Sequence, residues 1–193
     1  WLPESERKQQ LKTLLNHCSF DGIKIGLVKS LEFLQDILSD LRAHNPKTII
    51  VWDPVLSASA GFDFGHDLTK LNAVLKAVDW VTPNWNEALR LGQTEDVQEA
   101  CKQLSEYTSI YLKGGHNKES PGKDFLWNNG EVRAFNPKPG IYYEKHGSGC
   151  VFSAALVATL VSGYPARKAV LRTKRYMEHF LKSHQTKLGL HYG

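Results

Sequence analysis

A short glycine-rich stretch, Gly147-Ser148-Gly149-Cys150, stands directly before an apolar, alanine-rich run. Glycines let backbone N–H groups turn toward a ligand, and a helix that begins there adds unpaired N–H groups and a partial positive charge. The pattern predicts an anion site suited to phosphate, in which the same field favours the thiolate form of Cys150. The structural alternative is a tight turn of small residues that packs a buried helix.

Two familiar phosphate-binding motifs do not describe this turn. The dinucleotide pattern GxGxxG would need glycine where Phe152 stands. The stretch that comes nearest to a Walker loop, "GHNKESPGKD", has the wrong spacing and ends in Asp124. The sequence therefore predicts a phosphate site of another type.

Polar residues also follow several apolar runs. Lys113 ends "SIYLK" and precedes Gly114-Gly115, where a lysine can reach phosphate oxygens as a point charge or simply extend into solvent at a strand end. Asp53 ends "TIIVWD", where its carboxylate can serve a metal or a substrate, or form an Asp-Pro turn.

The stretch "VTPNWNEALRL" offers a second carboxylate at a predicted helix start. Glu87 lies in the first turn, where it can orient a hydrated Mg²⁺. Asn84 and Glu87 also have the spacing of a reciprocal helix cap. The two interpretations are compatible with each other.

Alternating periodicities predict the elements that position these residues. We expect helices over 4–16, 30–44, 67–78, 86–92, 96–107, 148–162 and 165–183, strands over 21–28, 47–55, 79–84 and 108–115, and a hairpin around Asn129-Gly130. This order predicts an α/β fold of three layers, α/β/α, with a mostly parallel central sheet. In such sheets ligands bind at the carboxyl ends of the strands, which is where Gly26, Asp53, Thr82–Asn84, Lys113 and the glycine turn fall.

Composition narrows the class of protein. The chain has 193 residues and a formal net charge of +4, with Lys and Arg spread along it, so we expect one domain and no nucleic-acid partner. No apolar run reaches the roughly 18 residues of a membrane span. The three cysteines form no CxxC pair, which argues against a disulfide framework or a zinc site and favours the cytoplasm.

The motifs "IKIGLV", "VWDPVLSASAG", "VTPNWNEALRL", "YLKGGH" and "HGSGCVFSAALVATL" occur in the order and spacing of the ribokinase-like superfamily. Within it, the chain most resembles hydroxymethylpyrimidine/phosphomethylpyrimidine kinases of thiamine biosynthesis. The resemblance implies a ribokinase-like fold, ATP and Mg²⁺ as cofactors, a hydroxymethylpyrimidine as the small-molecule substrate, and a homodimer. The roles it implies are catalysis for Gly147, Ser148, Gly149 and Cys150, ATP or phosphate binding for Lys113, Gly115, Thr82 and Asn84, pyrimidine contacts for Leu27 and Val55, and Mg²⁺ binding for Glu87 and Asp53.

The chain departs from this family at two points. Ser148 stands where the family usually has threonine, which keeps the hydroxyl group. The family's opening strand and its substrate loop are absent, and the first methionine is Met177, so we expect residues 1–193 to be a fragment of such a kinase domain. A pyridoxal kinase and a non-catalytic nucleotide-binding remnant remain the alternative functions.

Overall fold

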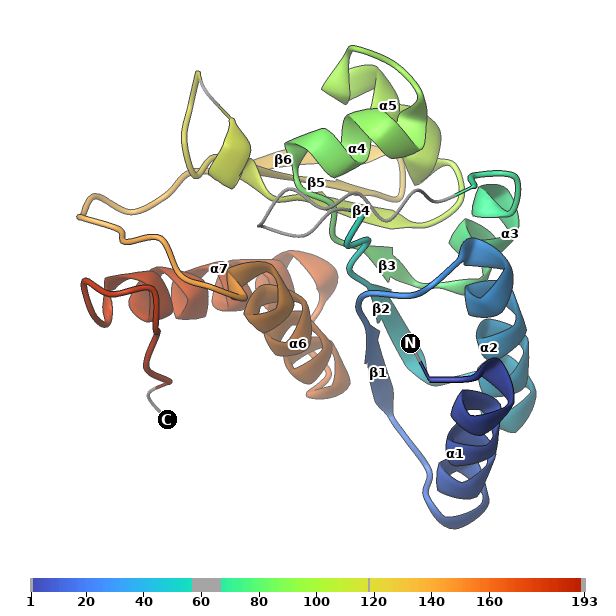
Figure 1. The fold of residues 1–193 in the computed structure, drawn as a ribbon. Coiled ribbons are helices and arrows are strands. Elements are labelled where there is room, and N and C mark those ends of the chain that lie inside the picture. The colour runs from blue at the N-terminus through green and yellow to red at the C-terminus, as the bar shows by residue number, and fades with distance from the viewer. Residues whose placement is uncertain (1, 57–66, 118, 192–193) are drawn as a thin grey trace.

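The computed structural model describes residues 2–56, 67–117 and 119–191. A six-stranded sheet in the order β1-β2-β3-β4-β5-β6 runs through it (Figure 1). Strands β1 to β4 are parallel, whereas β5 and β6 form an antiparallel hairpin on β4. The elements are α1 (Glu4–His17), β1 (Gly22–Ile25), α2 (Leu31–His44), β2 (Ile49–Trp52), α3 (Leu71–Ala77), β3 (Trp80–Val81), α4 (Trp85–Gly92), α5 (Val97–Ser105), β4 (Ser109–Leu112), η1 (Gly114–His116), β5 (Asp124–Asn128), β6 (Glu131–Phe135), α6 (Ser148–Val161) and α7 (Ala166–Lys182).

The sheet separates two hydrophobic cores. Successive side chains of a strand point to opposite faces, so Ile50 and Trp52 of β2 join one core and Val51 joins the other. Helices α2 to α5 bury their apolar faces in the first core, and α6 and α7 bury theirs in the second. Figure 1 shows these helix layers on the two sides of the sheet. The predicted three-layer, mostly parallel α/β fold is confirmed.

Local signals that the sequence offered form as expected. The Ser30 hydroxyl accepts a hydrogen bond from the Phe33 backbone N–H at 3.2 Å and caps α2. Asn129 and Gly130 have φ angles of 51° and 75°, the left-handed conformations that a two-residue hairpin turn requires. The turn fixes the register of β5 and β6, so the hairpin continues the sheet beyond β4.

Several boundaries differ from the predictions. The helix predicted over 67–78 begins at Leu71, because the Asp67 carboxylate accepts the Thr69 N–H at 2.9 Å and holds a turn instead. The strand predicted over 79–84 is confined to Trp80–Val81, since Asn84 already caps the next helix. The strand predicted over 108–115 ends at Leu112 and is followed by the 3-10 turn η1.

A buried ion pair ties α7 to the sheet. Lys174 Nζ donates to Asp124 Oδ2 at 2.6 Å, and the Tyr111 hydroxyl donates to the same oxygen at 2.5 Å. Asp124 Oδ1 accepts the Gly114 N–H at 2.6 Å. Burial, aided by the negative charge of Asp124, raises the pKa of Tyr111 well above its usual value. The pair therefore connects the α6/α7 layer to the backbone that directly follows Lys113.

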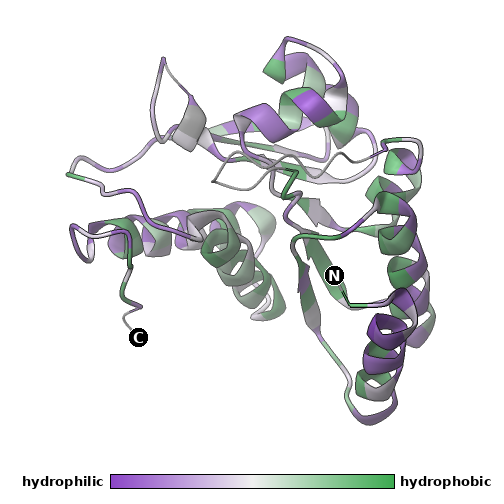
Figure 2. Cartoon of the chain, in the orientation of Figure 1, coloured by the Kyte–Doolittle hydropathy of each residue, from purple (hydrophilic) through white to green (hydrophobic). Residues whose placement is uncertain are grey.

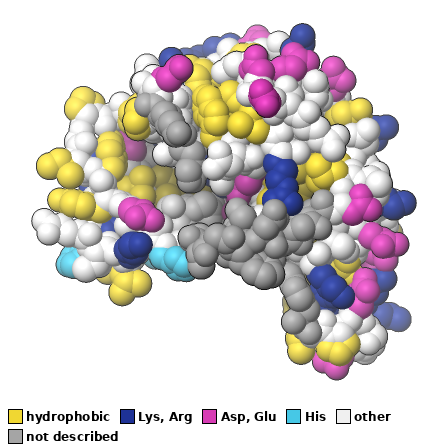
Figure 3. All heavy atoms as spheres, turned by 45° about the horizontal axis from the view of Figure 1, so that its top comes forward, with side chains coloured by type: hydrophobic (Ala, Val, Ile, Leu, Met, Phe, Trp, Pro, Cys, Tyr) yellow, Lys and Arg dark blue, Asp and Glu magenta, His cyan; other side chains and the backbone are white. Residues whose placement is uncertain are grey.

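The surface shown in Figure 3 carries acidic and basic side chains in a mixed arrangement. Apolar residues lie on the central strands and on the faces of the helices that cover them, and Figure 2 shows α6 as hydrophobic around most of its circumference. A helix of this kind is normally covered on several sides, and α6 packs on β1, β2 and α7. Among the residues that the structure describes, no helix has both the length and the apolar character needed to cross a membrane.

Candidate active site

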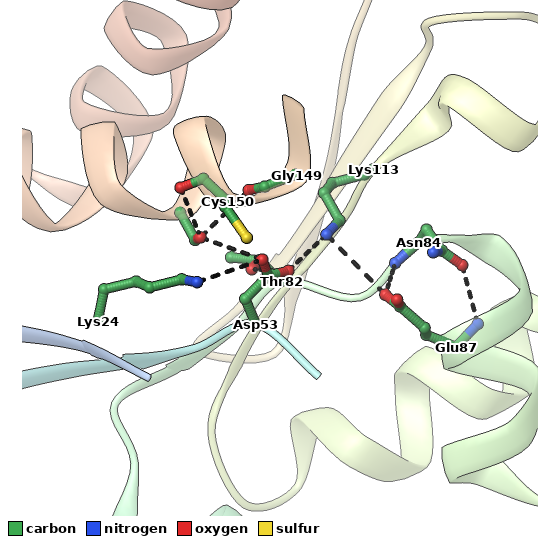
Figure 4. A network of polar contacts seen from close by, with 9 residues as sticks. Lys24, Asp53, Thr82, Asn84, Glu87, Lys113, Gly149 and Cys150 are labelled. Atoms are coloured by element: carbon green, nitrogen blue, oxygen red, sulfur yellow. Dashed lines mark hydrogen bonds and ion pairs between the residues drawn. The ribbon is translucent and has the colours of Figure 1, made fainter. Parts of the chain in front are cut away.

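Four polar side chains form a row on the face of the sheet that α6 covers. They are Lys24, Asp53, Thr82 and Lys113, at the carboxyl ends of the four parallel strands. Asp53, Thr82 and Lys113 each stand two positions after a residue of the hydrophobic core that α6 covers. These core residues are Val51, Trp80 and Tyr111, respectively. Because side chains two apart share a face, the strand pattern that builds this core also directs the polar row toward the helix (Figure 4).

Asp53 is the centre of the row and is 1% exposed. Its Oδ1 atom accepts a hydrogen bond from Lys113 Nζ at 2.6 Å and a longer one from the Thr82 hydroxyl at 3.4 Å. Its Oδ2 atom lies 3.8 Å from Lys24 Nζ and accepts from the Ser153 hydroxyl at 3.3 Å. A buried carboxylate needs such partners, and here they come from three strands and from α6.

The predicted turn stands at the beginning of α6. Gly147 has a φ angle of 73°, a left-handed conformation that favours glycine, and no side chain among the described residues caps the helix. Val151 N–H donates to the Gly147 carbonyl at 3.0 Å, and Ser148 N–H donates to a carbonyl three residues earlier at 3.4 Å. Within the described part of the chain, the N–H groups of Gly149 and Cys150 have no acceptor. They are the orphan donors that an anion can satisfy.

The glycine turn lies directly against the polar row. A Cβ atom at Gly149 would stand 3.2 Å from Lys113 Nζ and 3.8 Å from Asp53 Oδ2. Ser153, one turn later, joins the two features, because its hydroxyl contacts both Asp53 and the Gly149 carbonyl, the latter at 3.1 Å. The absence of a side chain at position 149 thus lets the Lys113 ammonium lie close to the backbone at the start of α6.

The three cysteines differ in their environment. Cys150 and Cys18 are exposed, whereas Cys101 is buried on α5. Burial raises the pKa of Cys101 to about 12, so its thiol stays protonated at neutral pH. Of the two exposed cysteines, Cys150 is the one at a helix start beside a lysine and a carboxylate, as Figure 4 shows.

Asn84 and Glu87 form the reciprocal cap that their spacing predicts. Asn84 Oδ1 accepts the Glu87 N–H at 3.0 Å, and Glu87 Oε2 accepts the Asn84 N–H at 2.7 Å. The same Oε2 atom lies 3.9 Å from Lys113 Nζ. Burial raises the pKa of Glu87, while Lys113 and the hydrogen bond to Asn84 oppose that shift. Glu87 therefore caps α4 and also faces the site.

The remaining predicted residues lie around this network without joining it. Gly115 is exposed in η1, and a Cβ atom there would meet none of the described residues within 4 Å. Leu27 is 42% exposed just after β1, and Val55 is half-buried just after β2. Since β1 and β2 are parallel neighbours, both residues lie at the same end of the sheet as Asp53.

Two residues of the site were missed by sequence reasoning. Lys24 stands inside the apolar run "GIKIGLV", and Ser153 stands inside the apolar helix α6. In each case the only available signal is one polar residue in an otherwise apolar segment, because burying an unpaired polar group is costly. The Ser153 hydroxyl donates to Asp53 at 3.3 Å, whereas the Lys24 ammonium lies 3.8 Å from the same carboxylate.

Together, these groups can hold a polyanion and accept a proton. Among the described residues, the N–H groups of Gly149 and Cys150 have no acceptor, and the Lys113 ammonium lies beside Gly149. Figure 4 shows the Cys150 sulfur on the side of Asp53. Such positively charged groups stabilise negative charge that develops during a transfer of phosphate. Glu87 Oε1 accepts no hydrogen bond from the described residues, which leaves a carboxylate oxygen for a water molecule of hydrated Mg²⁺.

Comparison with known proteins gives consistent matches. A family model described as phosphomethylpyrimidine kinase matches residues 1–193. A hydroxymethylpyrimidine/phosphomethylpyrimidine kinase of Staphylococcus aureus is 32% identical over 181 residues, which cover 88% of this chain and 65% of that relative. The chain therefore spans about two thirds of the length of this relative.

Solved structures share the fold. The pyridoxal kinase of Staphylococcus aureus, in complex with AMP-PCP and pyridoxal, superimposes with a TM-score of 0.80 at 24% identity and covers 94% of this chain and 69% of that one. The phosphomethylpyrimidine kinase of Clostridium difficile superimposes with a TM-score of 0.67 at 22% identity, covering 91% and 75%. These likenesses support the ribokinase-like architecture.

Proposed function

Because this chain belongs to the phosphomethylpyrimidine kinase family, we propose that it transfers the γ-phosphoryl group of ATP to 4-amino-5-hydroxymethyl-2-methylpyrimidine and then to the resulting monophosphate, in thiamine biosynthesis. The observation that carries this proposal is the position of Gly149, whose missing side chain leaves Lys113 Nζ facing the unpaired N–H groups at the start of α6. Phosphoryl transfer depends mainly on positioning and on charge stabilisation of this kind.

In the proposed mechanism, ATP lies with its phosphates between Lys113 and the start of α6. The Lys113 ammonium leaves Asp53 to contact phosphate oxygens, and the N–H groups of Gly149 and Cys150 donate to the transferred group. Thr82 and Asn84 line the same edge, next to Asp53 and Glu87. In this proposal the phosphate donor lies toward Lys113 and Glu87.

The acceptor approaches from the side of β1, where Leu27 and Val55 offer apolar surface to the pyrimidine ring. The oxygen of its hydroxymethyl group attacks the γ-phosphorus, the bond to the β-phosphate oxygen breaks, and ADP leaves. The proton of the hydroxyl group passes to the Cys150 sulfur, which acts as the general base. Direct transfer of this kind needs no covalent enzyme intermediate.

Magnesium fits one of its two proposed ligands better than the other. Glu87 has a free carboxylate oxygen, whereas both Asp53 oxygens are paired with protein groups. Glu87 would hold the ion through water, and Asp53 would join it once Lys113 has moved to phosphate. When bound, Mg²⁺ neutralises negative charge on the nucleotide phosphates.

A substrate panel tests the proposed function. We expect the complete encoded protein, supplied with ATP and Mg²⁺, to form ADP with the hydroxymethylpyrimidine and with its monophosphate, and product masses identify each step. Preference for pyridoxal over both pyrimidines would establish the first alternative function, a pyridoxal kinase. ATP binding without phosphorylation of any of the three compounds would establish the second, a non-catalytic remnant.

Variants of Glu87 distinguish its role in capping α4 from its proposed role in binding Mg²⁺. Glu87→Gln keeps an oxygen for the Asn84 N–H, whereas Glu87→Ala loses it and should cost about 1 kcal/mol of stability. Burial raises the pKa of Glu87 in the folded chain, so ionisation is costlier there than in the unfolded chain. This cost to stability is absent below the pKa that Glu87 has in the unfolded chain, and it grows as pH rises through the pKa that Glu87 has in the folded chain. The glutamine variant, which cannot ionise, should therefore gain stability relative to wild type at neutral pH.

Both Glu87 variants should lose activity and need more Mg²⁺, by about tenfold or more for a lost outer-sphere ligand. Thermal melts at pH 4 and pH 7, with ADP formation measured over a Mg²⁺ series, provide the comparison. Wild-type activity in the glutamine variant would show that Glu87 serves the cap alone.

Two further properties belong to the proposal, the first suggested by the family resemblance and the second by the pattern of cysteines. We propose a homodimer and a cytoplasmic location for the complete protein. Sedimentation of the purified protein at micromolar concentration tests the first of these, and a monomer would contradict it.

A further inference from the structure

Lys24 is a charged residue with too few partners for its position. Its side chain is 22% exposed, and its ammonium lies 3.8 Å from Asp53 Oδ2, beyond hydrogen-bonding distance. A lysine ammonium carries three donors, and among the described residues none accepts from it. Gly26 leaves the space that the ammonium occupies, because a Cβ atom there would lie 2.5 Å from Lys24 Nζ.

The charges around Lys24 do not balance within the row. Asp53 is one carboxylate between two ammonium groups, and its short hydrogen bond goes to Lys113 at 2.6 Å rather than to Lys24. Glu87 lies nearest to Lys113 as well, at 3.9 Å. A partly buried cation whose nearest carboxylate oxygen among the described residues lies beyond hydrogen-bonding distance favours an additional anionic ligand.

The position of Lys24 indicates which ligand this is. Figure 4 shows Lys24 and Lys113 approaching Asp53 from opposite sides, with Cys150 and Gly149 above the space between them. If the phosphate donor occupies the end with Lys113 and Glu87, as the proposed function states, the Lys24 end faces the acceptor. Lys24 also belongs to β1, the strand that leads to Leu27.

The two proposed acceptors differ in the charge of the group that attacks ATP. The hydroxyl group of the alcohol is neutral, whereas the phosphate group of the monophosphate carries a charge between −1.5 and −2 at about pH 7. Its oxygens must approach a γ-phosphate that is also negative, and a cation on the acceptor side offsets this repulsion. The neutral alcohol does not need that offset.

We infer that Lys24 binds the phosphate group of a phosphorylated acceptor, so that it is a specificity-determining residue for the second transfer and not for the first. This inference rests on the proposed function, because it assigns the two acceptors to that same site. The competing explanation is that Lys24 only balances the charge of Asp53, which would affect both transfers equally.

The test compares Lys24→Met with wild type on each acceptor. We expect kcat/KM for the monophosphate to fall about 10- to 100-fold, the range for a lost hydrogen bond to a charged group, and kcat/KM for the alcohol to change little. Starting from the alcohol, the variant should accumulate the monophosphate while wild type proceeds to the diphosphate. Calorimetric titration with the monophosphate alone should show weaker binding to the variant.

Lys29→Met is the matched control, because Lys29 is an exposed lysine on the segment between β1 and α2 and its replacement should leave both transfers unchanged. An equal loss on both acceptors in Lys24→Met overturns the inference but keeps the proposed function. A wild-type protein that phosphorylates the alcohol alone overturns the inference and also the second transfer of the proposed function, but keeps the first transfer. A wild-type protein that phosphorylates neither acceptor overturns the proposed function, and the inference with it.

Discussion

Replacing Cys150 with alanine is expected to lower turnover on the alcohol acceptor by about 10²- to 10⁴-fold, the range for a lost general base. The affinity for ATP should stay almost unchanged, because the backbone N–H groups and Lys113 that would hold the phosphates are retained. Cys150 is exposed at the start of α6, so its removal leaves no cavity in either core. The loss should therefore concern chemistry and not folding.

The measurement is steady-state ADP formation with saturating alcohol, together with nucleotide binding by calorimetry. Cys18→Ala is the matched control, since it removes the other exposed thiol, at the C-terminal end of α1.

Cys150→Asp should recover part of the rate because a carboxylate can also accept the proton. The monophosphate needs less help from a base, because its attacking oxygen is already deprotonated, so its transfer should suffer less. Unchanged turnover in Cys150→Ala would rule out Cys150 as the general base.

Replacing Lys113 with methionine is expected to act on both stability and catalysis. The side chains of Lys113 and Asp53 are 17% and 2% exposed, so the variant leaves a buried carboxylate without its close cation. Breaking such a pair costs about 3 kcal/mol, toward the low end of the usual range because Lys24 stays near. Loss of the cation that would contact the transferred phosphate should also lower kcat/KM for ATP by about 10²- to 10³-fold.

A double variant distinguishes these two effects. Lys113→Met combined with Asp53→Asn removes both charges, so thermal stability should return toward the wild-type value while activity stays low. Urea unfolding and ADP formation report the two quantities separately. Recovery of activity in the double variant would show that Lys113 matters only as a partner of Asp53, and the proposed contact with ATP would have to be abandoned.

The fold was predictable because its local signals agree with one another. Apolar runs such as "TIIVW" mark strands that are covered on both faces, and Ser30 and Asn129-Gly130 mark a helix start and a hairpin turn, all as the structure has them. The misplaced boundaries arise from side-chain bonds that periodicity does not report. Residues 67–70 lie outside α3 because the Asp67 carboxylate accepts a hydrogen bond from the Thr69 N–H, a contact that depends on local geometry.

The site was only partly predictable, for a different reason. The sequence indicated that Asp53, Lys113, Glu87 and the glycine turn would meet, because the ends of parallel strands share one edge of the sheet. It did not indicate that both Asp53 oxygens would be paired, since the pairing of Asp53 with Lys24 and Ser153 depends on which strand face α6 covers. The chemical roles of these residues stay predictions until the variants are measured.

The ion pair of Asp124 and Lys174 has a consequence for how the chain can evolve. A single substitution at either position leaves an unpaired charge in the interior. Changing both to apolar residues removes the charges but leaves the Tyr111 hydroxyl and the Gly114 N–H without this acceptor. Drift at these positions therefore passes through an unfavourable intermediate, and we expect descendants to keep both residues or to lose both. Because Asp124 also holds the Gly114 N–H, lineages that lose the pair must find another anchor for the backbone beside Lys113 or give up its function.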